Sequence, residues 1–422
     1  MNILLIGAGA REHSIALALK NSPSTNNLFS APANPGILKL ASLADIDISN
    51  HQSIIDFCKI NNIDLVVVGP EQPLADGVAD SLNSAKIPVF GPSKFAAQLE
   101  SSKDFAKRFM IDNSIPTANY RSFSIDEKES AINYIKSQNL PIVIKADGLA
   151  AGKGVIIAED LDSAIEAINS IFDGEFGKAG AKIVIEEFME GEEASLFAIC
   201  DGNDFVFLAS SQDHKRIGAN DTGKNTGGMG SYAPAKIVTE KVLNSAKKEI
   251  AEKVLAGMKD LKAPYIGCLY IGLMIKNDIP KVVEFNCRFG DPETQSVLAV
   301  FQGDFAKLLY SAAIGKLDLS AIDSICANSA CTVVIASKGY PDSFAKGYEI
   351  YGIEAAEELN ISVLHAGTSL KEGKLLSAGG RVLSIVAKAE NLKDAIELAY
   401  KGIDKIELEN KYYRPDIGKK GL

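Results

Sequence analysis

The chain has 422 residues, of which 46% are hydrophobic and 23% charged, a balance typical of a soluble globular protein. This length suggests about three domains of ~150 residues each. The net charge of −10 argues against a nonspecific nucleic-acid binder, and no apolar run approaches the ~18 residues that span a bilayer.

The cysteines indicate a reducing environment, and the few histidines argue against a zinc site. The six cysteines lie mostly within apolar runs and form no C-x-x-C pair, which predicts buried thiols in the cytoplasm. With four histidines and no His/Cys cluster, a zinc site is not expected. The first residues lack the basic region of a signal peptide and are typical of a strand.

Residues 2–6 predict a buried strand, which a glycine-containing turn connects to a helix that ends near Lys20. This is the pattern of the first βα turn of a doubly wound sheet. The third glycine of a dinucleotide fingerprint would fall where Glu12 stands, so a nicotinamide site is disfavoured. Phosphate binding at the helix N-terminus beside Arg11 is favoured over a plain tight turn, whereas His13 alone is typical of a helix surface.

A second unit follows, with a helix over 51–60 and strands over 64–68 and 87–90. The turn after the first of these strands carries Glu71, which by itself is typical of a solvated turn carboxylate. A helix over 96–112 places two lysines, Lys103 and Lys107, on one face, where lysines are ordinarily solvated.

Residues 141–158 predict two strands joined by the glycine-rich loop 147–154. This is a hairpin flap and differs from the strand–loop–helix of a P-loop. Such a flap can place backbone N–H groups over phosphates. Lys145 interrupts an apolar strand, which favours a functional charge over a surface lysine.

Acidic residues mark the next hairpin. Glu186 and Glu187 end an apolar strand and Glu193 begins the next, so they suit either a ribose or metal site or a solvated hairpin. Residues 210–216 then cluster ionisable side chains. The near P-loop at 218–225 lacks the Ser or Thr that holds Mg²⁺ and is followed by glycines, which predicts a flexible loop over an active site.

A strand over 281–288 carries the strongest functional pattern. Alternation places Glu284, Asn286 and Arg288 on one face and Val283, Phe285 and Cys287 on the apolar face. Oxygen ligands suit Mg²⁺, and a guanidinium suits a phosphate or carboxylate. The turn that follows adds Asp291 and Glu293. A solvated edge strand is the alternative for this stretch alone.

From about residue 328 the composition changes. Strands over 330–336 and 381–387 and a helix over 392–403 predict a small α+β domain. The helix has an apolar side formed by Ala395, Leu398, Ala399 and Ile403. We therefore expect three domains, at 1–101, 102–327 with a flap subdomain at about 120–192, and 328–422.

In this order, a lysine-bearing flap, an acidic hairpin and a Glu-x-Asn strand resemble the ATP-grasp superfamily. The individual motifs are similar to those of the phosphoribosylamine–glycine ligase family, over essentially the whole chain. These motifs are IGAGAREH, VGPE, IKADGLAAGKGV, SQDHKR, NTGGMG, EFNCRFGDPE and RPDIG. The chain departs from the family pattern at Ala10 and Ala33, where the family usually has glycine.

The resemblance implies an α/β fold with a Rossmann-like N-terminal parallel sheet, a central ATP-grasp fold and a small C-terminal α+β domain. It implies ATP-dependent ligation of glycine to 5-phosphoribosylamine through a glycyl phosphate, the second step of purine synthesis. ATP would be a substrate and Mg²⁺ or Mn²⁺ the metal. The partners would be small molecules only, without nucleic acid or membrane, and the enzyme would be a cytoplasmic monomer.

The same resemblance implies roles for individual residues. The metal ligands would be Glu284 and Asn286. Residues that bind ATP would be Lys103, Lys145, Gly152, Lys153, Gly154, Glu186, Glu187, Phe188, Met189 and Glu193. Phosphoribosylamine would be bound by Gly9, Arg11, Glu12, His13, Asn34 and Glu71. The catalytic residues would be Lys145, Asp213, Lys215, Arg288 and Asp291.

Three other functions are weighed against this one. An ATP-grasp ligase for another acid or amine is the nearest alternative. A nicotinamide dehydrogenase is disfavoured by Glu12, and a non-catalytic nucleotide-binding regulator is disfavoured by the intact Glu-x-Asn strand.

Overall fold

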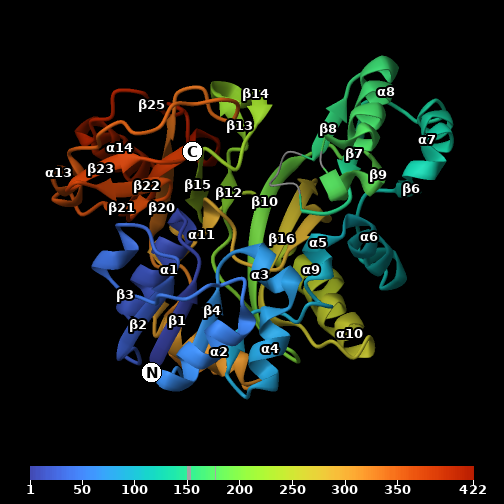
Figure 1. Cartoon of the computed structure of the whole chain (residues 1–422). Helices are drawn as coiled ribbons and strands as arrows, with labels where there is room; N and C mark the ends of the chain where they lie inside the picture. The colour runs from blue at the N-terminus through green and yellow to red at the C-terminus, as the bar shows by residue number, and fades with distance from the viewer. Residues whose placement is uncertain (150–153, 176) are drawn as a thin grey trace.

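The computed structural model describes residues 1–149, 154–175 and 177–422. The chain folds into an N-terminal domain, a central sheet with a projecting lobe, and a C-terminal domain, and the lobe stands apart from the C-terminal domain (Figure 1). Among the described helices, none combines the length and the apolar character needed to cross a bilayer.

The N-terminal domain is built on a fully parallel sheet with the strand order β3-β2-β1-β4-β5. Its strands are β1 (Asn2–Ile6), β2 (Asn27–Ala31), β3 (Ser42–Leu43), β4 (Leu65–Val68) and β5 (Val89–Phe90). Its helices are α1 (Ala10–Lys20), α2 (His51–Ile60), α3 (Glu71–Asp76), α4 (Val78–Ser84) and α5 (Gln98–Ser101). The strand order reverses at β1, which confirms the predicted doubly wound sheet and directs the ends of β1 and β4 toward one crevice.

The predicted helix over 96–112 is wrong in one respect, because it is two helices. The backbone is extended at Ser102, which ends α5. The Ser102 hydroxyl oxygen then caps α6 (Lys103–Asp112) by accepting the N–H of Phe105. The break starts α6 at Lys103.

The projecting lobe is the predicted flap subdomain. Its antiparallel sheet has the order β6-β9-β7-β8, and β7 and β8 form the predicted hairpin. Its elements are β6 (Tyr120–Ser124), α7 (Lys128–Ile135), β7 (Ile142–Ala146), β8 (Val155–Ala158), α8 (Leu161–Ser170) and β9 (Lys182–Glu187). Half of the loop of this hairpin, residues 150–153 of 147–154, lies outside the described residues.

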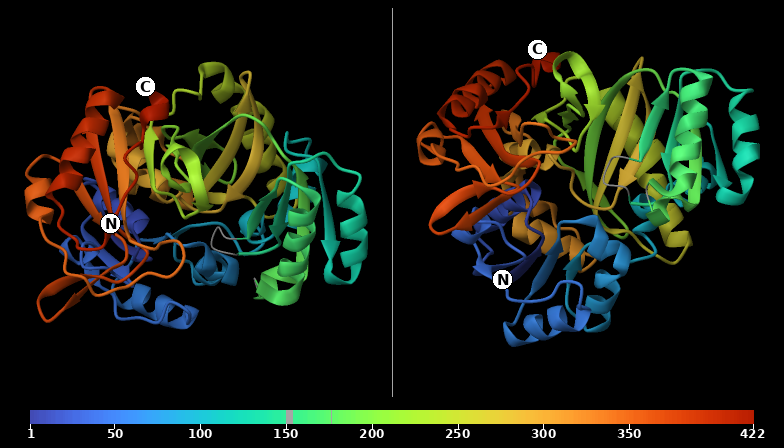
Figure 2. Two further views of the ribbon diagram at one scale, coloured as in Figure 1. Left: turned by 90° about the horizontal axis from the view of Figure 1, so that it is seen from above. Right: turned by 45° about the horizontal axis from the view of Figure 1, so that its top comes forward.

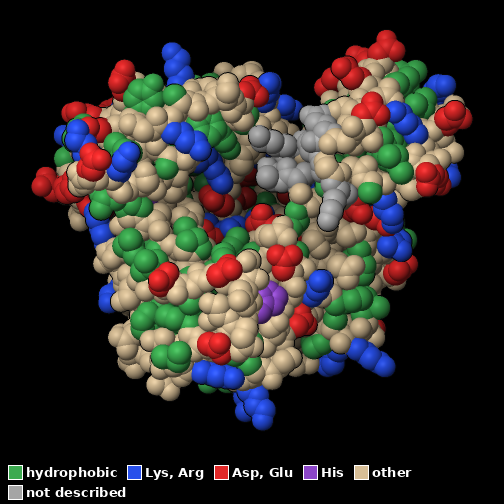
Figure 3. All heavy atoms as spheres, in the orientation of Figure 1, with side chains coloured by type: hydrophobic (Ala, Val, Ile, Leu, Met, Phe, Trp, Pro, Cys, Tyr) green, Lys and Arg blue, Asp and Glu red, His purple; other side chains and the backbone are tan. Residues whose placement is uncertain are grey.

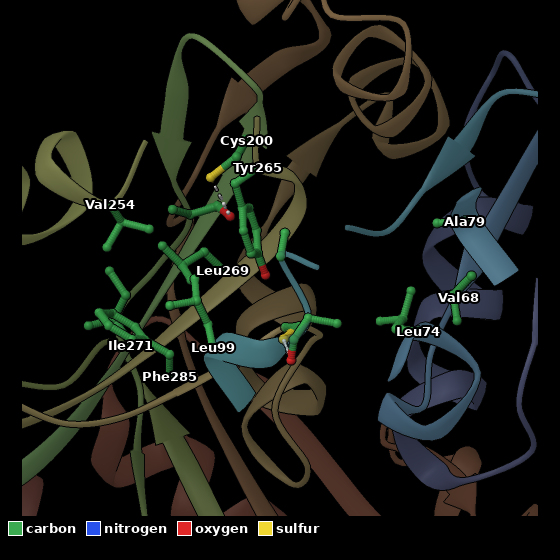
Figure 4. Close-up of a cluster of buried hydrophobic side chains, with 14 of the residues drawn as sticks. Val68, Leu74, Ala79, Leu99, Cys200, Val254, Tyr265, Leu269, Ile271 and Phe285 are labelled. Carbon is green, nitrogen blue, oxygen red and sulfur yellow. Dashed lines mark hydrogen bonds between the residues drawn. The ribbon is translucent and has the colours of Figure 1, made fainter. Parts of the chain in front are cut away.

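The central antiparallel sheet has the order β11-β10-β16-β17 and forms the floor between the lobe and the N-terminal domain. Its strands are β10 (Glu192–Asp201), β11 (Phe205–Phe207), β16 (Ile266–Lys276) and β17 (Ile279–Asn286). The helices in this part of the chain are α9 (Glu240–Ala246) and α10 (Glu252–Asp260), which precede β16, and α11 (Glu293–Val300) and α12 (Phe305–Ala313), which follow β17. Figure 4 shows the apolar core here, where Ile271 and Phe285 lie near Val254 of α10 and Leu99 of α5.

The predicted alternation along β17 fails at one residue. A register shift pairs Gly272 with Glu284 but Leu273 with Val282, so Val283 has no residue opposite it on β16. Val282 therefore packs in the core with Phe285 and Cys287, whereas Val283 is only half-buried. The interpretation that placed Val283 on the apolar face is wrong, because a bulge cannot be seen in a two-residue period.

The C-terminal domain is organised on the strand order β12-β15-β20-β24-β21. Its strands are β12 (Gln212–Asp213), β15 (Gly230–Ala233), β20 (Ser329–Ser337), β21 (Ser362–His365), β24 (Arg381–Ala389) and β25 (Lys411–Tyr412). Its helices are α13 (Ile353–Glu357) and α14 (Leu392–Lys405), and smaller pairs are β18 (Gln302–Gly303) with β19 (Ile322–Ser324) and β22 (Thr368–Lys371) with β23 (Lys374–Ser377). Strands β12 and β15 belong to the predicted central domain, 102–327, yet they pair within this sheet. The sheet therefore contains strands of two predicted domains, and the predicted domain boundaries stay predictions.

The segment predicted as a flexible glycine-rich loop contains the small hairpin β13 (Arg216–Gly218) and β14 (Thr222–Asn225). The hairpin lies against the end of the C-terminal domain, as the views in Figures 1 and 2 agree. Buried Arg414 attaches it there by donating to Arg216 O and to Asp221, each at 2.9 Å. The segment is thus held by tertiary contacts that the local sequence does not reveal.

Candidate active site

The site lies in a hollow between the lobe and the C-terminal domain, and acidic and basic side chains are visible inside it (Figure 3). Strand β17 contributes to the floor, β7 and β9 face it from the lobe, and the N-terminus of α1 approaches it from the N-terminal domain. The fold therefore brings residues of the N-terminal domain, the lobe and the central sheet together at this site.

Glu186 at the end of β9 is shared by two lysines. Its carboxylate contacts Lys145 Nζ at 2.8 Å and Lys107 Nζ at 2.9 Å, and all three side chains are at most 6% exposed. Burial lowers the pKa of Lys107 to about 8, although the Glu186 charge acts in the opposite direction. The expectation of a solvated Lys107 is wrong, because α6 turns this residue toward β9.

Lys145 reaches the bulged edge of the central sheet, and Lys103 reaches the hairpin of the lobe. Lys145 also donates to the carbonyl oxygen of the bulge residue Val283 at 3.3 Å. Lys103, the first residue of α6, donates to Gly148 O at 3.0 Å. Glu186 has one formal negative charge and two cationic partners, so the group as a whole retains positive charge for an anion.

Glu284 on β17 is a half-buried carboxylate with no ion pair or hydrogen bond to any residue of the described ranges. Burial raises its pKa, but the charges of Lys215, Lys145 and Lys103 outweigh burial and the net shift is downward. The carboxylate is therefore ionised and open to a cation that arrives with its own phosphate ligands. The described residues contain no group of three or more His, Cys, Asp or Glu side chains placed to hold a metal.

Asn286 and Arg288 follow on the same face, as predicted. Arg288 contacts Glu100 of α5 at 2.8 Å and Glu71 of α3 at 3.3 Å. The amide nitrogen of Asn286, turned toward Glu100, donates to its Oε1 at 2.9 Å. Burial raises the pKa of Glu100 despite the Arg288 charge. Glu71 is thus an ion-pair partner, and the interpretation as a solvated turn carboxylate is wrong.

Lys215 is a further cation close to Glu284, and Asp213 is close to Lys215. Lys215 contacts Glu193 at the start of β10 at 2.5 Å. Burial raises the pKa of Asp213 well above its ordinary range, although the Lys215 charge opposes this shift. Glu293, at the N-terminus of α11, is also buried and raised in pKa by burial, and Tyr270 donates to it at 3.1 Å. Asp213, whose pKa burial raises to about 8, can therefore hold a proton near neutral pH.

The N-terminus of α1 is arranged around Glu12. The Glu12 carboxylate accepts the N–H of Gly9 at 2.6 Å and pairs with Arg11 at 2.6 Å. A side chain at Gly69 would meet the same carboxylate at 2.3 Å, so glycine is required where β4 passes it. Glu12 thus fills the space that a third glycine would leave open. Arg11 lies 3.9 Å from Glu71, which connects this turn to Arg288.

His13 and Asn34 join the N-terminal and C-terminal domains. The His13 Nδ1 accepts the N–H of His365 at 2.8 Å, and the Asn34 amide donates to Ala8 O and His365 O. His13 is 7% exposed, so its description as typical of a helix surface does not hold in this fold. Burial lowers its pKa to about 3, which keeps the imidazole neutral.

Comparison with known proteins agrees with this arrangement. Models of the phosphoribosylglycinamide synthetase N domain, ATP-grasp (A) domain and C domain match residues 1–100, 101–294 and 330–420. The chain belongs to the phosphoribosylglycinamide synthetase family. A phosphoribosylamine–glycine ligase of Rhizobium meliloti is 46% identical over 99% of this chain and 98% of its own length. One from Neisseria meningitidis is 46% identical over the full length of both chains.

Solved structures support the same family and fold. The phosphoribosylamine–glycine ligase of Thermotoga maritima has a TM-score of 0.86 at 31% identity and covers 99% of this chain and 100% of its own. A biotin carboxylase domain of Hydrogenobacter thermophilus 2-oxoglutarate carboxylase has a TM-score of 0.71 at 16% identity, covering 98% of this chain and 91% of its own. At that identity the second likeness concerns the fold alone.

Some residues that the family resemblance implied lie at the edge of the hollow or outside the description. Glu187 is exposed and bonds to Asn119 at 2.8 Å, and Phe188 is 40% exposed in the link from β9 to β10. Met189 in the same link is half-buried. Gly154 is buried, and its carbonyl oxygen accepts the N–H of Ala146 at 2.8 Å. Gly152 and Lys153 lie outside the described residues.

Sequence reasoning missed Lys107, Glu100 and Arg381 as members of the site. Lys107 carried a signal, since it shares a helix face with Lys103, four residues away. Glu100 and Arg381 carried no signal in the sequence. Glu100 pairs with Arg288, and Arg381 pairs with Asp291, each across a large separation in the chain. Their contacts with the predicted site residues are visible only in the folded chain.

Proposed function

We propose that this chain ligates glycine to 5-phosphoribosylamine at the expense of ATP, and releases glycinamide ribonucleotide, ADP and phosphate. The observation that carries the proposal is that Lys103, Lys145 and Lys215 all act on the Glu284 carboxylate, which has no ion-pair or hydrogen-bond partner within the described ranges. This arrangement suits a nucleotide triphosphate with a divalent cation. The full-length match to phosphoribosylamine–glycine ligases supports the choice of substrates.

Glu284 and Asn286 would hold Mg²⁺, because they offer an ionised oxygen and an amide oxygen on one strand face. The chemistry supplied by the metal would be neutralisation of charge on the ATP phosphates. Mn²⁺ prefers similar oxygen ligands and is the alternative metal.

In the first step, a carboxylate oxygen of glycine attacks the γ-phosphorus of ATP. An O–P bond forms, the bond to the β-phosphate oxygen breaks, and ADP leaves with glycyl phosphate remaining. Phosphoryl transfer depends on alignment and on neutralised charge more than on covalent help. In this proposal Lys145 and Lys103 bind the phosphates, and Arg288 faces the transferring group.

In the second step, the nitrogen of phosphoribosylamine attacks the carbonyl carbon of glycyl phosphate. A C–N bond forms, the C–O bond to phosphate breaks, and the nitrogen loses a proton. Asp213 is suited to accept that proton because burial raises its pKa toward neutrality. In this proposal the hairpin of β7 and β8 covers the acyl phosphate and excludes water.

The phosphoribosyl group is proposed to bind at the N-terminus of α1. Gly9 and Arg11 lie there, and the first turn of a helix presents free N–H groups to an anion. Glu71 and Asn34 border the same crevice at the ends of the parallel strands, where open sheets bind ligands. Glu187, Phe188 and Met189, in the link between the lobe and the central sheet, would contact adenine, and Glu193 would contact the ribose.

The test is ADP release with glycine and phosphoribosylamine each omitted in turn. The proposal expects release of ADP only when glycine is present, and formation of glycinamide ribonucleotide only with all three substrates. Release of ADP without glycine would favour a ligase for another acid, and turnover of NADH without ATP would favour a dehydrogenase.

The enzyme is further proposed to be a cytoplasmic monomer. The resemblance to the family implies the monomer, and the cytoplasmic location is supported by the six cysteines, which form no disulfide and of which five are buried. Light scattering on the purified protein tests the monomer, since a mass of twice 44.9 kDa would contradict it.

A further inference from the structure

Arg381, the first residue of β24, extends from the C-terminal domain into the site. Its Nη2 donates to Asp291 Oδ2 at 3.0 Å. Its Nη1 donates to Gly227 O at 2.5 Å and to Asp291 O at 3.0 Å. One planar guanidinium thus connects the glycine-rich segment, residues 226–230, to the turn that follows β17.

The two connected segments are packed tightly against this guanidinium. A side chain at Gly227 would lie 3.0 Å from Arg381 Cζ, and one at Gly228 would lie 2.3 Å from Pro292 Cδ. Gly228 also has a φ of 104°, which favours glycine. The N–H of Gly227 donates to Tyr340 at 2.8 Å, so the C-terminal domain fixes the segment from both sides.

Both oxygens of the Asp291 carboxylate are held. Oδ1 accepts from Gln295 of α11 at 3.0 Å, and Oδ2 accepts from Arg381. Burial raises the pKa of Asp291, but the charges of Arg381 and Arg11 outweigh it and the net shift is downward, so the group is ionised. An ionised carboxylate with a fixed direction can orient a nitrogen that carries N–H groups.

Asp291 Oδ2 also faces the N-terminal domain. A side chain on Gly9 would come within 3.9 Å of this oxygen, which places Oδ2 beside the first turn of α1. This is the crevice proposed above for the phosphoribosyl group. The carboxylate therefore lies where the amine of that substrate would approach the acyl phosphate.

We propose that Arg381 is a positioning residue that fixes Asp291 against the N-terminus of α1, so that Asp291 accepts a hydrogen bond from the attacking amine. The inference rests on the proposed function. It assigns to the C-terminal domain a part in handling the amine substrate, while the lysines of α6 and β7 handle the nucleotide.

The test compares Arg381→Met and Arg381→Lys with Lys388→Met, an exposed lysine on the same strand. In Arg381→Met, kcat/KM for phosphoribosylamine should fall about 100-fold, the loss expected from a misplacement of ~1 Å, while KM for ATP stays unchanged. Arg381→Lys should recover part of the loss because it keeps a donor and a charge. Lys388→Met should behave as the wild type.

A double-mutant cycle with Asp291→Asn separates positioning from general damage. If Arg381 acts only through Asp291, the double variant loses no more kcat/KM for phosphoribosylamine than the more impaired of the two single variants. Additive losses, or a parallel rise of KM for ATP, would overturn the inference. If circular dichroism shows that Arg381→Met is unfolded, Arg381→Lys takes its place in the cycle, and additivity there overturns it equally. A wild-type protein that forms no glycinamide ribonucleotide refutes the proposed function instead.

Discussion

Lys107 Nζ lies 2.9 Å from the Glu186 carboxylate, and both side chains are almost completely buried. The same carboxylate pairs with Lys145, so Lys107 supplies the second positive charge of a three-residue group. With Lys107 charged, Glu186 is neutralised and Lys145 keeps attraction for a phosphate. When Lys107 loses its proton, Glu186 acts on Lys145 alone.

The first prediction concerns pH. Burial lowers the pKa of Lys107 to about 8, so its charge is lost as the pH rises through that value. KM for ATP should therefore rise between about pH 7 and pH 9 in the wild type. Lys107→Met lacks the charge throughout, so its KM should be high at pH 7 and nearly independent of pH. A variant that keeps the wild-type pH dependence would show that another group titrates.

The second prediction concerns Lys145. Replacement by Met should reduce kcat by a factor of about 100 to 1,000, the effect typical of losing one preorganised contact worth ~3 kcal/mol. The fold should persist, because the Glu186 carboxylate keeps Lys107 as a partner. Single-turnover kinetics and circular dichroism check the two parts. Wild-type turnover in this variant would falsify the assignment of Lys145.

The third prediction concerns the metal. Removal of divalent ions with a chelator should stop ADP release, and added Mg²⁺ should restore it. Glu284→Gln keeps the size of the side chain but removes its charge, so a much higher Mg²⁺ concentration should be needed for half-maximal rate. Glu190→Gln, an exposed acid paired with Lys276, is the matched control and should keep the wild-type requirement.

The fourth prediction concerns stability. Arg414 is fully buried and donates to both oxygens of Asp416, at 2.9 and 2.8 Å, and to Asp221. Arg414→Met should lower the free energy of unfolding by about 3 kcal/mol, since it removes the fully buried guanidinium that pairs with two partly buried acids, Asp416 and Asp221. The exposed Arg108→Met, which breaks only an i,i+4 pair, should cost less than about 0.5 kcal/mol. The urea midpoints of unfolding of Arg414→Met and Arg108→Met measure the difference. Equal midpoints would contradict a stabilising role of Arg414.

The fifth prediction follows from Asp416. Burial raises the pKa of its carboxyl group, but hydrogen bonds from Arg414 outweigh it and lower the pKa to about 2. Because the folded-state pKa lies below the ordinary value of 3.8, the stabilisation is complete above about pH 4 and is lost as the pH falls toward 2. The difference in unfolding free energy between wild type and Asp416→Asn should therefore shrink over that range. A constant difference would rule out this carboxylate as the titrating group.

Local patterns along the chain were enough to predict the parallel sheet of the N-terminal domain, the flap hairpin and the Glu284–Asn286 face. Each of these depends on periodicity or on turn residues within a few positions, which a single sequence displays directly. The motif order was also enough for the family, because several motifs are long and occur in a fixed order.

Only the tertiary structure decided which charges meet. The bulge at Val283, the burial of Lys107 against Glu186 and the reach of Arg381 to Asp291 all depend on how separate elements pack. Packing sets these contacts because the residues that bury a charged group, and so shift its pKa, are distant from it in the chain. The sequence by itself determined which chemical groups were present, and the fold determined which of them face one another.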